Sequence, residues 1–341
     1  MACRSNLYQR GILKQHRLEV PVISIGNLVL GGTGKTPLVY CVAKLLKKHG
    51  RKPAILSRGY KGSAVTPINV VSDTVNILLD AKEAGDEPRL LAEKLPGIPV
   101  ITGKKRYTTG RFAIDSLEAD VLILDDGFQH LALKRDLDIV LFNARNIFGN
   151  GRVLPGGELR EPLAALKRAD AFIIIGINEL LEGNAKKCIS HLKTLYPEKP
   201  IFNGVYRPEA MLLRIFNGKT DTVSHKEAGK IPLYGFCGIA NPESFKSLLE
   251  ITGMKLTGFQ AFDDHHVYST GNIRSLLRNA KESGAHGLVT TEKDLVKLRS
   301  IFPQVTLLLI VPVHLLLDGD FEQFFFSRIP KNHRAKHMAQ G

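Results

Sequence analysis

Tryptophan is absent from this chain of 341 residues, and cysteine is scarce. The four cysteines (Cys3, Cys41, Cys188 and Cys237) are scattered, without the paired spacing of a zinc site or a disulfide framework, which fits a reducing compartment. Aromatic residues make up 7% of the chain and few of them lie within the basic runs. Proteins that bind single-stranded nucleic acid stack bases on such residues, so we expect no nucleic-acid partner.

Long hydrophobic segments are also missing. The longest apolar run, residues 305–317, is interrupted by Pro312 and His314 and is too short to span a bilayer, so it indicates a buried strand and its exit. The first twenty residues lack the apolar centre of a secretory signal. We therefore expect any contact with a membrane to be made from its surface.

Acidic residues are outnumbered, with 33 Asp and Glu against 47 Lys and Arg and a formal net charge of +14. The basic residues crowd the first twenty positions, the end of the first predicted helix and the tail. Such an excess favours anionic partners, which include nucleic acid, lipid headgroups and phosphorylated substrates. Taken alone, a solvated basic surface explains it equally well.

The most informative segment that is present is Gly31-Gly32-Thr33-Gly34-Lys35-Thr36. A β-branched run at 20–25 precedes it, and apolar residues at helical spacing follow it up to Gly50. A strand, a glycine-rich turn and a helix N-terminus together wrap phosphate oxygens, with Lys35 on the outer phosphates and the Thr36 hydroxyl on Mg²⁺. The usual spacing places a glycine where Val29 stands. We predict a nucleotide-binding loop formed by Val29, Leu30, Gly31, Gly32, Thr33, Gly34, Lys35 and Thr36.

Acidic residues follow two further apolar runs. Residues 121–124 lead into Asp125-Asp126-Gly127-Phe128-Gln129-His130, and a strand-end aspartate beside a phosphate loop holds Mg²⁺ or its waters. Residues 255–262 lead into Asp263-Asp264-His265-His266, which suggests a metal site, a general base with its orienting partner, or a polar loop. Phosphoryl transfer to an alcohol needs such a base near the acceptor hydroxyl.

Other charged groups have a structural interpretation beside the functional one. Asp86 and Glu87 precede Pro88 at the start of a predicted helix, which favours helix capping over a catalytic role. Arg106 follows a strand within a cationic segment suited to an anionic substrate group, and Arg160 and Glu161 lie in a glycine turn that is either an active-site loop or an ordinary connection. Residues 290–294 read as a helix N-cap with early acids.

Short β-rich runs alternate with helical patterns along the whole chain, which predicts an α/β fold: a P-loop NTPase-like, doubly wound parallel sheet with a second, smaller α/β domain. We expect a first domain at 1–205 that begins with a short basic segment, a connecting segment at 206–230, a second domain at 231–328 and a disordered basic tail at 329–341.

Taken together, these motifs resemble the tetraacyldisaccharide 4′-kinase family, which acts in lipid A synthesis in Gram-negative bacteria. The resemblance covers most of the chain, and Asp-Asp-Gly-Phe-Gln-His and Thr-Glu-Lys-Asp are its specific motifs. The segments that carry it, in order, are residues 25–27, 31–36, 57–60, 85–88, 125–130, 159–162, 238–242, 264–266 and 291–294.

The resemblance implies transfer of the γ-phosphoryl group of ATP, with Mg²⁺, to the 4′-hydroxyl of an acylated disaccharide 1-phosphate. It implies a catalytic pair of Asp86 with a histidine of residues 264–266, for which we choose His265 over His266, and this overturns the capping interpretation of Asp86. Metal ligands would be Thr36, Asp125 or Glu161. It also implies a catalytic role for Asp126. The residues expected to bind substrate are Asn27, Glu87, Arg106, Gln129 and Arg160.

The resemblance also implies work at the cytoplasmic face of the inner membrane, as a peripheral protein. Family members often begin with a hydrophobic or amphipathic helix; here only Leu7, Tyr8, Ile12 and Leu13 are apolar, which fits a short interfacial helix on an anionic membrane surface. We expect a monomer. The main alternative is a P-loop GTPase or ATPase of the metal-chaperone type, but metal-handling tracts and a guanine-specifying Asn-Lys-x-Asp motif are both missing.

Overall fold

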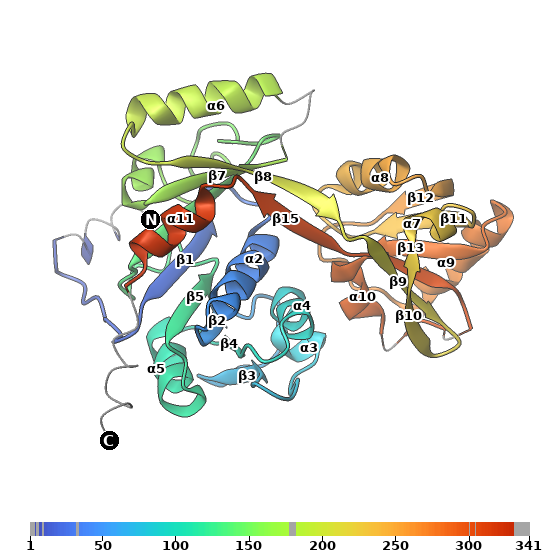
Figure 1. Cartoon of the computed structure of the whole chain (residues 1–341), viewed down its shortest axis with the longest axis horizontal. Helices are drawn as coiled ribbons and strands as arrows, with labels where there is room; N and C mark the ends of the chain where they lie inside the picture. Colours follow the sequence, from blue (N-terminus) through green and yellow to red (C-terminus); the bar gives the residue numbers. More distant parts are fainter. Residues whose placement is uncertain are drawn as a thin grey trace. The chain divides into compact units, whose positions relative to one another are not determined.

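The computed structural model describes residues 4, 7–8, 10–31, 34–176, 182–299, 301–303 and 305–330. The described chain divides into two compact units. The first consists of the described parts of 1–206 and 315–341, and the second is Arg207–His314. Each unit is built around its own sheet (Figure 1).

In its described residues, the first unit contains a sheet of nine strands in the order β15-β8-β7-β6-β1-β5-β2-β4-β3. Its strands are β1 (Val22–Asn27), β2 (Pro53–Ser57), β3 (Asn69–Ser72), β4 (Val100–Thr102), β5 (Val121–Asp125), β6 (Leu137–Asn143), β7 (Ala171–Ile175), β8 (Ile201–Pro208) and β15 (Val313–Leu317). Its helices are α2 (Lys35–Lys48), α3 (Ala81–Ala84), α4 (Asp86–Lys94), α5 (Arg106–Leu117), the 3₁₀ helix η1 (Leu163–Arg168), α6 (Glu182–Leu195) and α11 (Phe321–Arg328).

Alternate residues of the strands pack on opposite faces of this sheet. On β5, Val121 and Ile123 share a hydrophobic cluster with α2, whereas Leu122 and Leu124 share another with α5. Both faces are therefore covered by helices, which explains why the strands are apolar throughout instead of alternating. The doubly wound parallel sheet predicted from the sequence is confirmed, with β3 as an antiparallel edge strand.

The second unit has a smaller sheet in the order β10-β9-β14-β13-β11-β12, as far as its residues are described. Its strands are β9 (Met211–Phe216), β10 (Lys219–Ser224), β11 (Pro232–Cys237), β12 (Lys255–Ala261), β13 (Gly287–Thr291) and β14 (Leu308–Val311). Its helices are α7 (His225–Ala228), α8 (Pro242–Ile251), α9 (Thr270–Glu282) and α10 (Glu292–Leu298). Four consecutive strands, β14, β13, β11 and β12, pair in parallel with one another, as expected for a second α/β domain, and β9 joins β14 in the antiparallel sense.

The expected connecting segment at 206–230 is instead part of the second unit. Its polar residues form the antiparallel hairpin of β9 and β10, and β9 pairs with β14 at the edge of the sheet. Most of β10 is exposed, so this hairpin has few of the apolar positions by which strands are recognised in a sequence.

The expected second domain, 231–328, extends too far at its end. The apolar run at 305–317 is broken at Pro312 into two strands, because β14 joins the second sheet while β15 lies beside β8 in the first. α11 then packs its Phe321 and Phe325 into the same cluster as α2. Ile329, assigned to the expected tail, also belongs to this cluster, and the tail at 331–341 lies outside the described residues.

Candidate active site

The predicted phosphate loop connects the end of β1 to the start of α2. Gly34 is the N-cap of α2 with φ +81°, and a Cβ there would lie 1.9 Å from the Tyr206 hydroxyl, so both the backbone and the packing require glycine. A glycine N-cap has no side chain to bond the first backbone N–H groups of the helix, which suits an anion at this end. Gly32 and Thr33, also predicted here, lie outside the described residues.

Lys35 is held at the mouth of this loop by two acceptors. Its Nζ lies 3.1 Å from Oδ1 of Asn27 and 3.5 Å from Oδ1 of Asp126. Asn27 is fully buried and also donates to the carbonyl of Val29 at 2.5 Å, while Gln129 donates to the Asn27 carbonyl at 3.0 Å. Asn27 and Gln129, both expected to bind substrate, therefore hold the loop itself.

Val29 occupies the position where the usual loop has a glycine, and the structure gives it a separate role. It pairs with Leu159 in an isolated antiparallel bridge, and Leu30 donates its N–H to the carbonyl of Glu158 at 2.9 Å. Val29 and Leu159 are both buried in one hydrophobic cluster. The first half of the loop is thus fixed by strand pairing with residues 158–160.

Asp125 is the last residue of β5 and lies next to the phosphate loop. One of its carboxylate oxygens has a hydrogen-bond partner and the other has none among the described residues. Ser57, at the end of β2, donates its hydroxyl to Oδ2 at 3.1 Å, whereas Oδ1 is buried and has no hydrogen-bond partner among the described residues. Burial, together with the charges of Glu87 and Asp126 and against the opposing charge of Lys35, raises the pKa of Asp125 to about 7. Such an oxygen fits a cation better than it fits a closed structural site.

Asp126 has the opposite character although it is the next residue. It adopts φ +55° and accepts from Nη1 of Arg160 at 2.7 Å and 3.0 Å, with Lys35 on the same carboxylate. Burial alone would raise the pKa of Asp126, but Lys35 and Arg160 outweigh it, and the pKa lies below its ordinary value. The two adjacent carboxyl groups thus have pKa values shifted in opposite directions.

Asp86 and Glu87 occupy the first turn of α4, whose N-cap is Gly85. Gly85 has φ +91°, and a Cβ there would lie 2.6 Å from the carbonyl of Tyr60, so the turn before α4 is packed closely against the loop after β2. Glu87 is near enough to Asp125 to raise its pKa. Asp86 therefore starts a helix on the same side of the molecule as the two strand-end aspartates.

Arg106 begins α5 and is only 3% exposed. Burial lowers its pKa to about 10 against the opposing pull of Asp125 and Asp126, and its Nε has no partner within the described part of the chain. Burial also lowers the pKa of His130 to about 4, and Arg106 adds to this. A neutral His130 thus lies near a buried cation, with Arg58 contributing to the same field.

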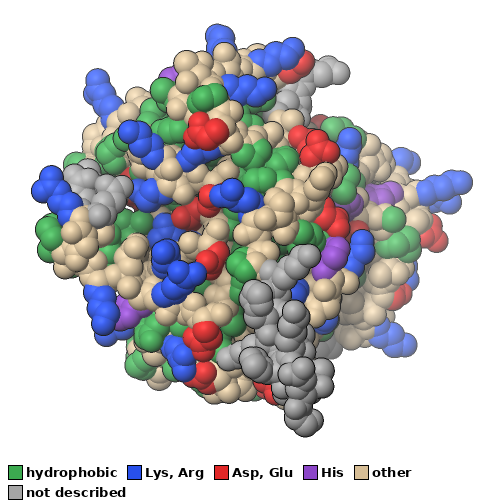
Figure 2. Space-filling view, turned by 60° about the vertical axis from the view of Figure 1, so that its left-hand side comes forward, with side chains coloured by type: hydrophobic (Ala, Val, Ile, Leu, Met, Phe, Trp, Pro, Cys, Tyr) green, Lys and Arg blue, Asp and Glu red, His purple; other side chains and the backbone are tan. Residues whose placement is uncertain are grey.

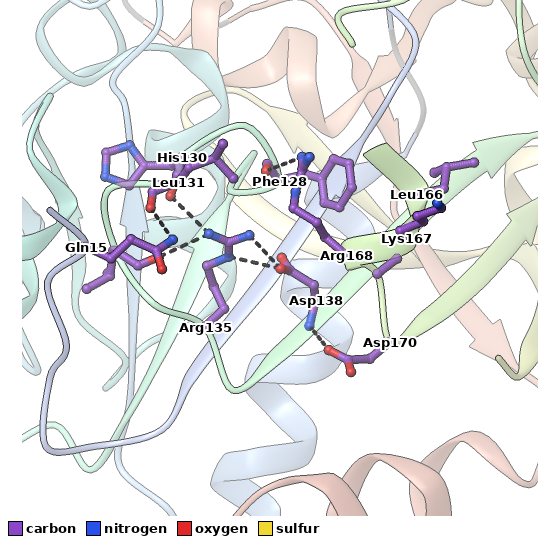
Figure 3. A network of polar contacts seen from close by, with 12 residues as sticks. Gln15, Phe128, His130, Leu131, Arg135, Asp138, Leu166, Lys167, Arg168 and Asp170 are labelled. Atoms are coloured by element: carbon purple, nitrogen blue, oxygen red, sulfur yellow. Dashed lines mark hydrogen bonds and ion pairs between the residues drawn. The ribbon is translucent and has the colours of Figure 1, made fainter. Parts of the chain in front are cut away.

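The chain that follows Asp126 is held by a polar network (Figure 3). Arg135 donates to Asp138 at 2.7 Å and 2.9 Å and to the carbonyls of His130 and Leu133. The backbone N–H of Asp138 in turn donates to Asp170 at 2.8 Å. These contacts fix the chain after the aspartate pair without using either aspartate.

Glu161 lies in a different environment from the other expected metal ligands. It is 2% exposed, and both its oxygens accept from Nη2 of Arg168, at 3.0 Å and 3.1 Å. The Arg168 guanidinium also covers the ring of Phe128 at 4.5 Å. Glu161 is thus paired with a cation, whereas Asp125 keeps one oxygen without a partner among the described residues.

His265 belongs to the second unit, where it adopts φ +61° after β12. Its Nε2 lies 3.2 Å from Nζ of Lys293 and 3.7 Å from Asp264, which Lys293 also contacts. His266 instead stacks on Phe262 at 4.6 Å and bonds Asn272. Of the two histidines, His265 is the one surrounded by charged groups.

Several contributors to this site were not selected from the sequence. Ser57 orients Asp125, and Leu159 holds Val29 in place. The signal for Ser57 was its position at the end of a strand, in a segment (57–60) that carries the family resemblance. No sequence signal marks Leu159, since its partner is 130 residues away.

No group of three or more His, Cys, Asp or Glu side chains suited to a metal ion occurs in the described residues. Mg²⁺ in nucleotide enzymes is held by one or two protein oxygens together with phosphate oxygens and water. The open oxygen of Asp125 and the hydroxyl of Thr36, at the start of α2, are a donor set of that kind. Among the described residues, no helix is long and apolar enough to cross a membrane.

A phosphate-binding loop after β1, a strand-end aspartate after β5 and a doubly wound parallel sheet define a P-loop kinase fold. The family model for tetraacyldisaccharide-1-P 4′-kinase matches residues 1–330. The chain belongs to the tetraacyldisaccharide 4′-kinase family, and it is an ATP-dependent kinase.

Individual relatives agree with this assignment. The chain is 46% identical over 327 residues to the tetraacyldisaccharide 4′-kinase of Desulfotalea psychrophila, with 96% of this chain and 92% of the relative covered. It is 44% identical to the enzyme of the same name from Syntrophus aciditrophicus, covering 86% of this chain and 80% of the relative. The crystal structure of LpxK from Aquifex aeolicus in complex with ATP is similar with a TM-score of 0.73 at 31% identity, covering 96% and 95% of the two chains.

Proposed function

We propose that the chain transfers the γ-phosphoryl group of ATP to the 4′-hydroxyl of a tetraacyldisaccharide 1-phosphate, giving lipid IVA in lipid A synthesis. The observation that carries this is the convergence of Lys35 and Arg160 on Asp126, beside the open oxygen of Asp125, at the phosphate loop of a chain of this family. In phosphoryl transfer, groups of this kind bind the triphosphate of the nucleotide on one side and face the acceptor hydroxyl on the other.

ATP binding is assigned to the loop from Val29 to Thr36 and the first turn of α2. Lys35 would contact the outer phosphates, and the backbone N–H groups at the helix start would bind the phosphate oxygens along the loop. The strand pairing of Val29 supports a loop that is already shaped before the nucleotide arrives.

Mg²⁺ would be held by Thr36 and Asp125, which offer the hard oxygen ligands that it prefers. When bound, it supplies charge stabilisation to the phosphate oxygens. The buried and unpartnered Oδ1 of Asp125 supports this assignment. Glu161 remains a weaker candidate, because its carboxylate is paired with Arg168.

Asp86 is proposed as the general base. The hydroxyl proton of the acceptor would pass to its carboxylate while the acceptor oxygen bonds to the γ-phosphorus, and the bridging oxygen leaves with ADP. His265 is proposed to orient or polarise Asp86, supported by its charged surroundings of Asp264 and Lys293. The acceptor side of the site is proposed to be lined by Arg106, Glu87, Gln129 and Asn27.

We further propose that the chain acts as a monomer on the cytoplasmic face of the inner membrane. Leu7 and Ile12 are 38% and 65% exposed, and Arg10 and Lys14 next to them are exposed as well. Figure 2 shows lysine and arginine side chains spread over one face of the molecule, interspersed with hydrophobic ones. Apolar and cationic groups side by side suit an anionic bilayer surface.

Removal of residues 1–14 tests the membrane proposal. We expect weaker binding to vesicles that contain anionic lipid, with unchanged transfer to substrate dispersed in detergent, because the segment contributes adhesion and no catalytic group. Co-sedimentation with anionic and with neutral vesicles measures this. Equal sedimentation of the full and shortened chains would remove the interfacial role of this segment.

The function itself is tested with labelled ATP and disaccharide 1-phosphate in mixed micelles, against the same reaction without lipid. We expect label in the lipid fraction and little phosphate release when lipid is omitted. Hydrolysis that is independent of lipid would instead favour the switch or delivery ATPase, the alternative reading of the phosphate loop.

A further inference from the structure

Two cations of the first unit converge on a single carboxylate. Nη1 of Arg160 contacts both oxygens of Asp126, at 2.7 Å and 3.0 Å, and Nζ of Lys35 lies 3.5 Å from one of them. Lysine at this position of a phosphate loop binds the outer phosphates of a nucleotide. Any group that meets the same oxygens as Lys35 is therefore within reach of those phosphates.

The backbone of Arg160 is fixed to the phosphate loop. Its N–H donates to the carbonyl of Leu28 at 2.8 Å, and the neighbouring Leu159 pairs with Val29. Leu159 is fully buried, so this attachment is part of the core and not a surface contact. The backbone of Arg160 is consequently held at a fixed place beside the phosphate loop.

The guanidinium group of Arg160 has hydrogen-bond donors that Asp126 does not use. Both of its hydrogen bonds to Asp126 come from Nη1, while the buried Nε has no hydrogen-bond partner in the described part of the chain. A buried arginine donor without an acceptor costs free energy unless a ligand supplies one. Planar arginine groups bind phosphate oxygens through two donors at once, which a lysine cannot do.

We infer that Arg160 is a catalytic cation for the transferring phosphoryl group, kept ready against Asp126 until phosphate oxygens replace the carboxylate. This role rests on the proposed function and deepens it. During transfer the bond from the γ-phosphorus to the bridging oxygen of ADP breaks with its electron pair, the acceptor oxygen bonds to phosphorus, and the acceptor proton goes to Asp86. Arg160 stabilises the charge on the phosphoryl oxygens between these events.

The competing role is recognition of a phosphate on the lipid. The two roles differ in kinetics, because a group that acts only in the transition state changes kcat, whereas one that binds the acceptor in its ground state changes KM. The comparison therefore needs both constants for ATP and for the disaccharide.

The test uses Arg160→Ala and Arg160→Gln, with Arg152→Ala as control because Arg152 is an exposed arginine of the same connection. We expect kcat to fall about 10³-fold in both Arg160 variants, with KM for the disaccharide nearly unchanged, as found for arginines that act on transferring phosphates. Arg160→Gln retains a donor for Asp126, so it reports on catalysis even if the alanine variant folds poorly.

Nucleotide binding provides a readout without turnover. Fluorescent ADP should bind the Arg160 variants as it binds the unaltered chain, but the tightening caused by aluminium fluoride, a mimic of the phosphoryl group in flight, should fall at least about tenfold. Unchanged tightening, or a raised KM for the disaccharide at unchanged kcat, would overturn the inference. Failure of the proposed function is distinguished by the unaltered chain, which would then not phosphorylate the disaccharide at all.

Discussion

Each unit has a buried aspartate near the end of one of its strands, Asp125 at the end of β5 and Asp294 in the helix that follows β13, and the two differ in their hydrogen bonding. Asp294 of the second unit is fully buried, and its oxygens accept from Gly238 at 3.0 Å, Tyr268 at 3.0 Å and Thr291 at 2.7 Å, with Lys297 at 2.9 Å. Every oxygen of this carboxylate is used. The group connects three segments of the second unit and has no capacity left for a ligand.

Asp125 of the first unit is as deeply buried but has one oxygen without a described partner. Its pKa is raised, while the carboxylate beside it is held by two cations. Proteins satisfy nearly all their buried polar groups, so an unsatisfied one indicates a site for something that binds. Asp138 also has a buried oxygen without a partner among the described residues, although it belongs to the supporting network of Arg135. Asp125 therefore stands out by two features together: its unpartnered oxygen and its position beside the phosphate loop.

The largest effect should come from Lys35→Ala. Without the ammonium group the outer phosphates lose their main cation, and we expect phosphoryl transfer to fall by at least about 10³-fold while the free energy of unfolding barely changes. Mixed-micelle kinetics and thermal denaturation measure the two. Lys48→Ala, an exposed lysine at the end of the same helix, should leave both unchanged. Near-normal turnover of Lys35→Ala would refute the phosphate-loop assignment.

Asp86→Ala should have the next largest effect. We expect kcat to fall by about 10²–10⁴-fold with ATP affinity little changed, as for removal of a general base. If His265 acts through Asp86, the double variant Asp86→Ala with His265→Ala should be no slower than the worse single variant. Additive losses would separate the two residues, and a loss confined to ATP binding would assign Asp86 to the nucleotide.

Asp294→Ala tests whether the buried aspartate of the second unit has a purely structural role. Removal of this acid leaves Lys297 and several donors buried without their partner, and we expect the second unit to lose about 3–5 kcal/mol of stability. Chemical denaturation should detect the loss, while nucleotide binding by the first unit stays unchanged at low temperature. Asp263→Ala, an exposed acid of the same unit, should cost far less. Weakened ATP binding in a folded Asp294→Ala variant would contradict a purely structural role.

The smallest effect is a pH dependence of Asp125. Because its folded pKa of about 7 lies above that of an unfolded aspartate, the folded chain holds the extra proton, and its stability falls as pH rises from about 4 to about 7. We expect Asp125→Asn to remove about 2–4 kcal/mol of that decline. Unfolding free energies of both proteins across this range give the difference, and parallel curves would mean that the group titrates normally.

Much of the fold could be predicted because the buried strands are continuous apolar runs in the sequence. Residues 121–124 and 171–175 are apolar throughout, and the glycine-rich turn before α2 has a local signature. The hairpin at 211–224 gives a weaker signal, because its edge strand is exposed and polar. The division of the run at 305–317 between two sheets depends on partners distant in the sequence.

The candidate site shows the same limit. Lys35, Asp125 and Asp126 lie in local motifs, so their neighbourhood was predictable. The pairing of Val29 with Leu159, and the attachment of Arg160 that follows from it, join segments about 130 residues apart and have no local signature. The ion pair of Glu161 with Arg168 likewise has no local signature in the sequence.

The most direct test of the account is the position of the new phosphate on the lipid. The purified chain would be incubated with ATP, Mg²⁺ and disaccharide 1-phosphate, and the product examined by phosphorus–proton correlation NMR. The account predicts a second phosphomonoester coupled to the proton at the 4′ carbon. A product phosphorylated elsewhere, or free phosphate with an unaltered disaccharide, would contradict it.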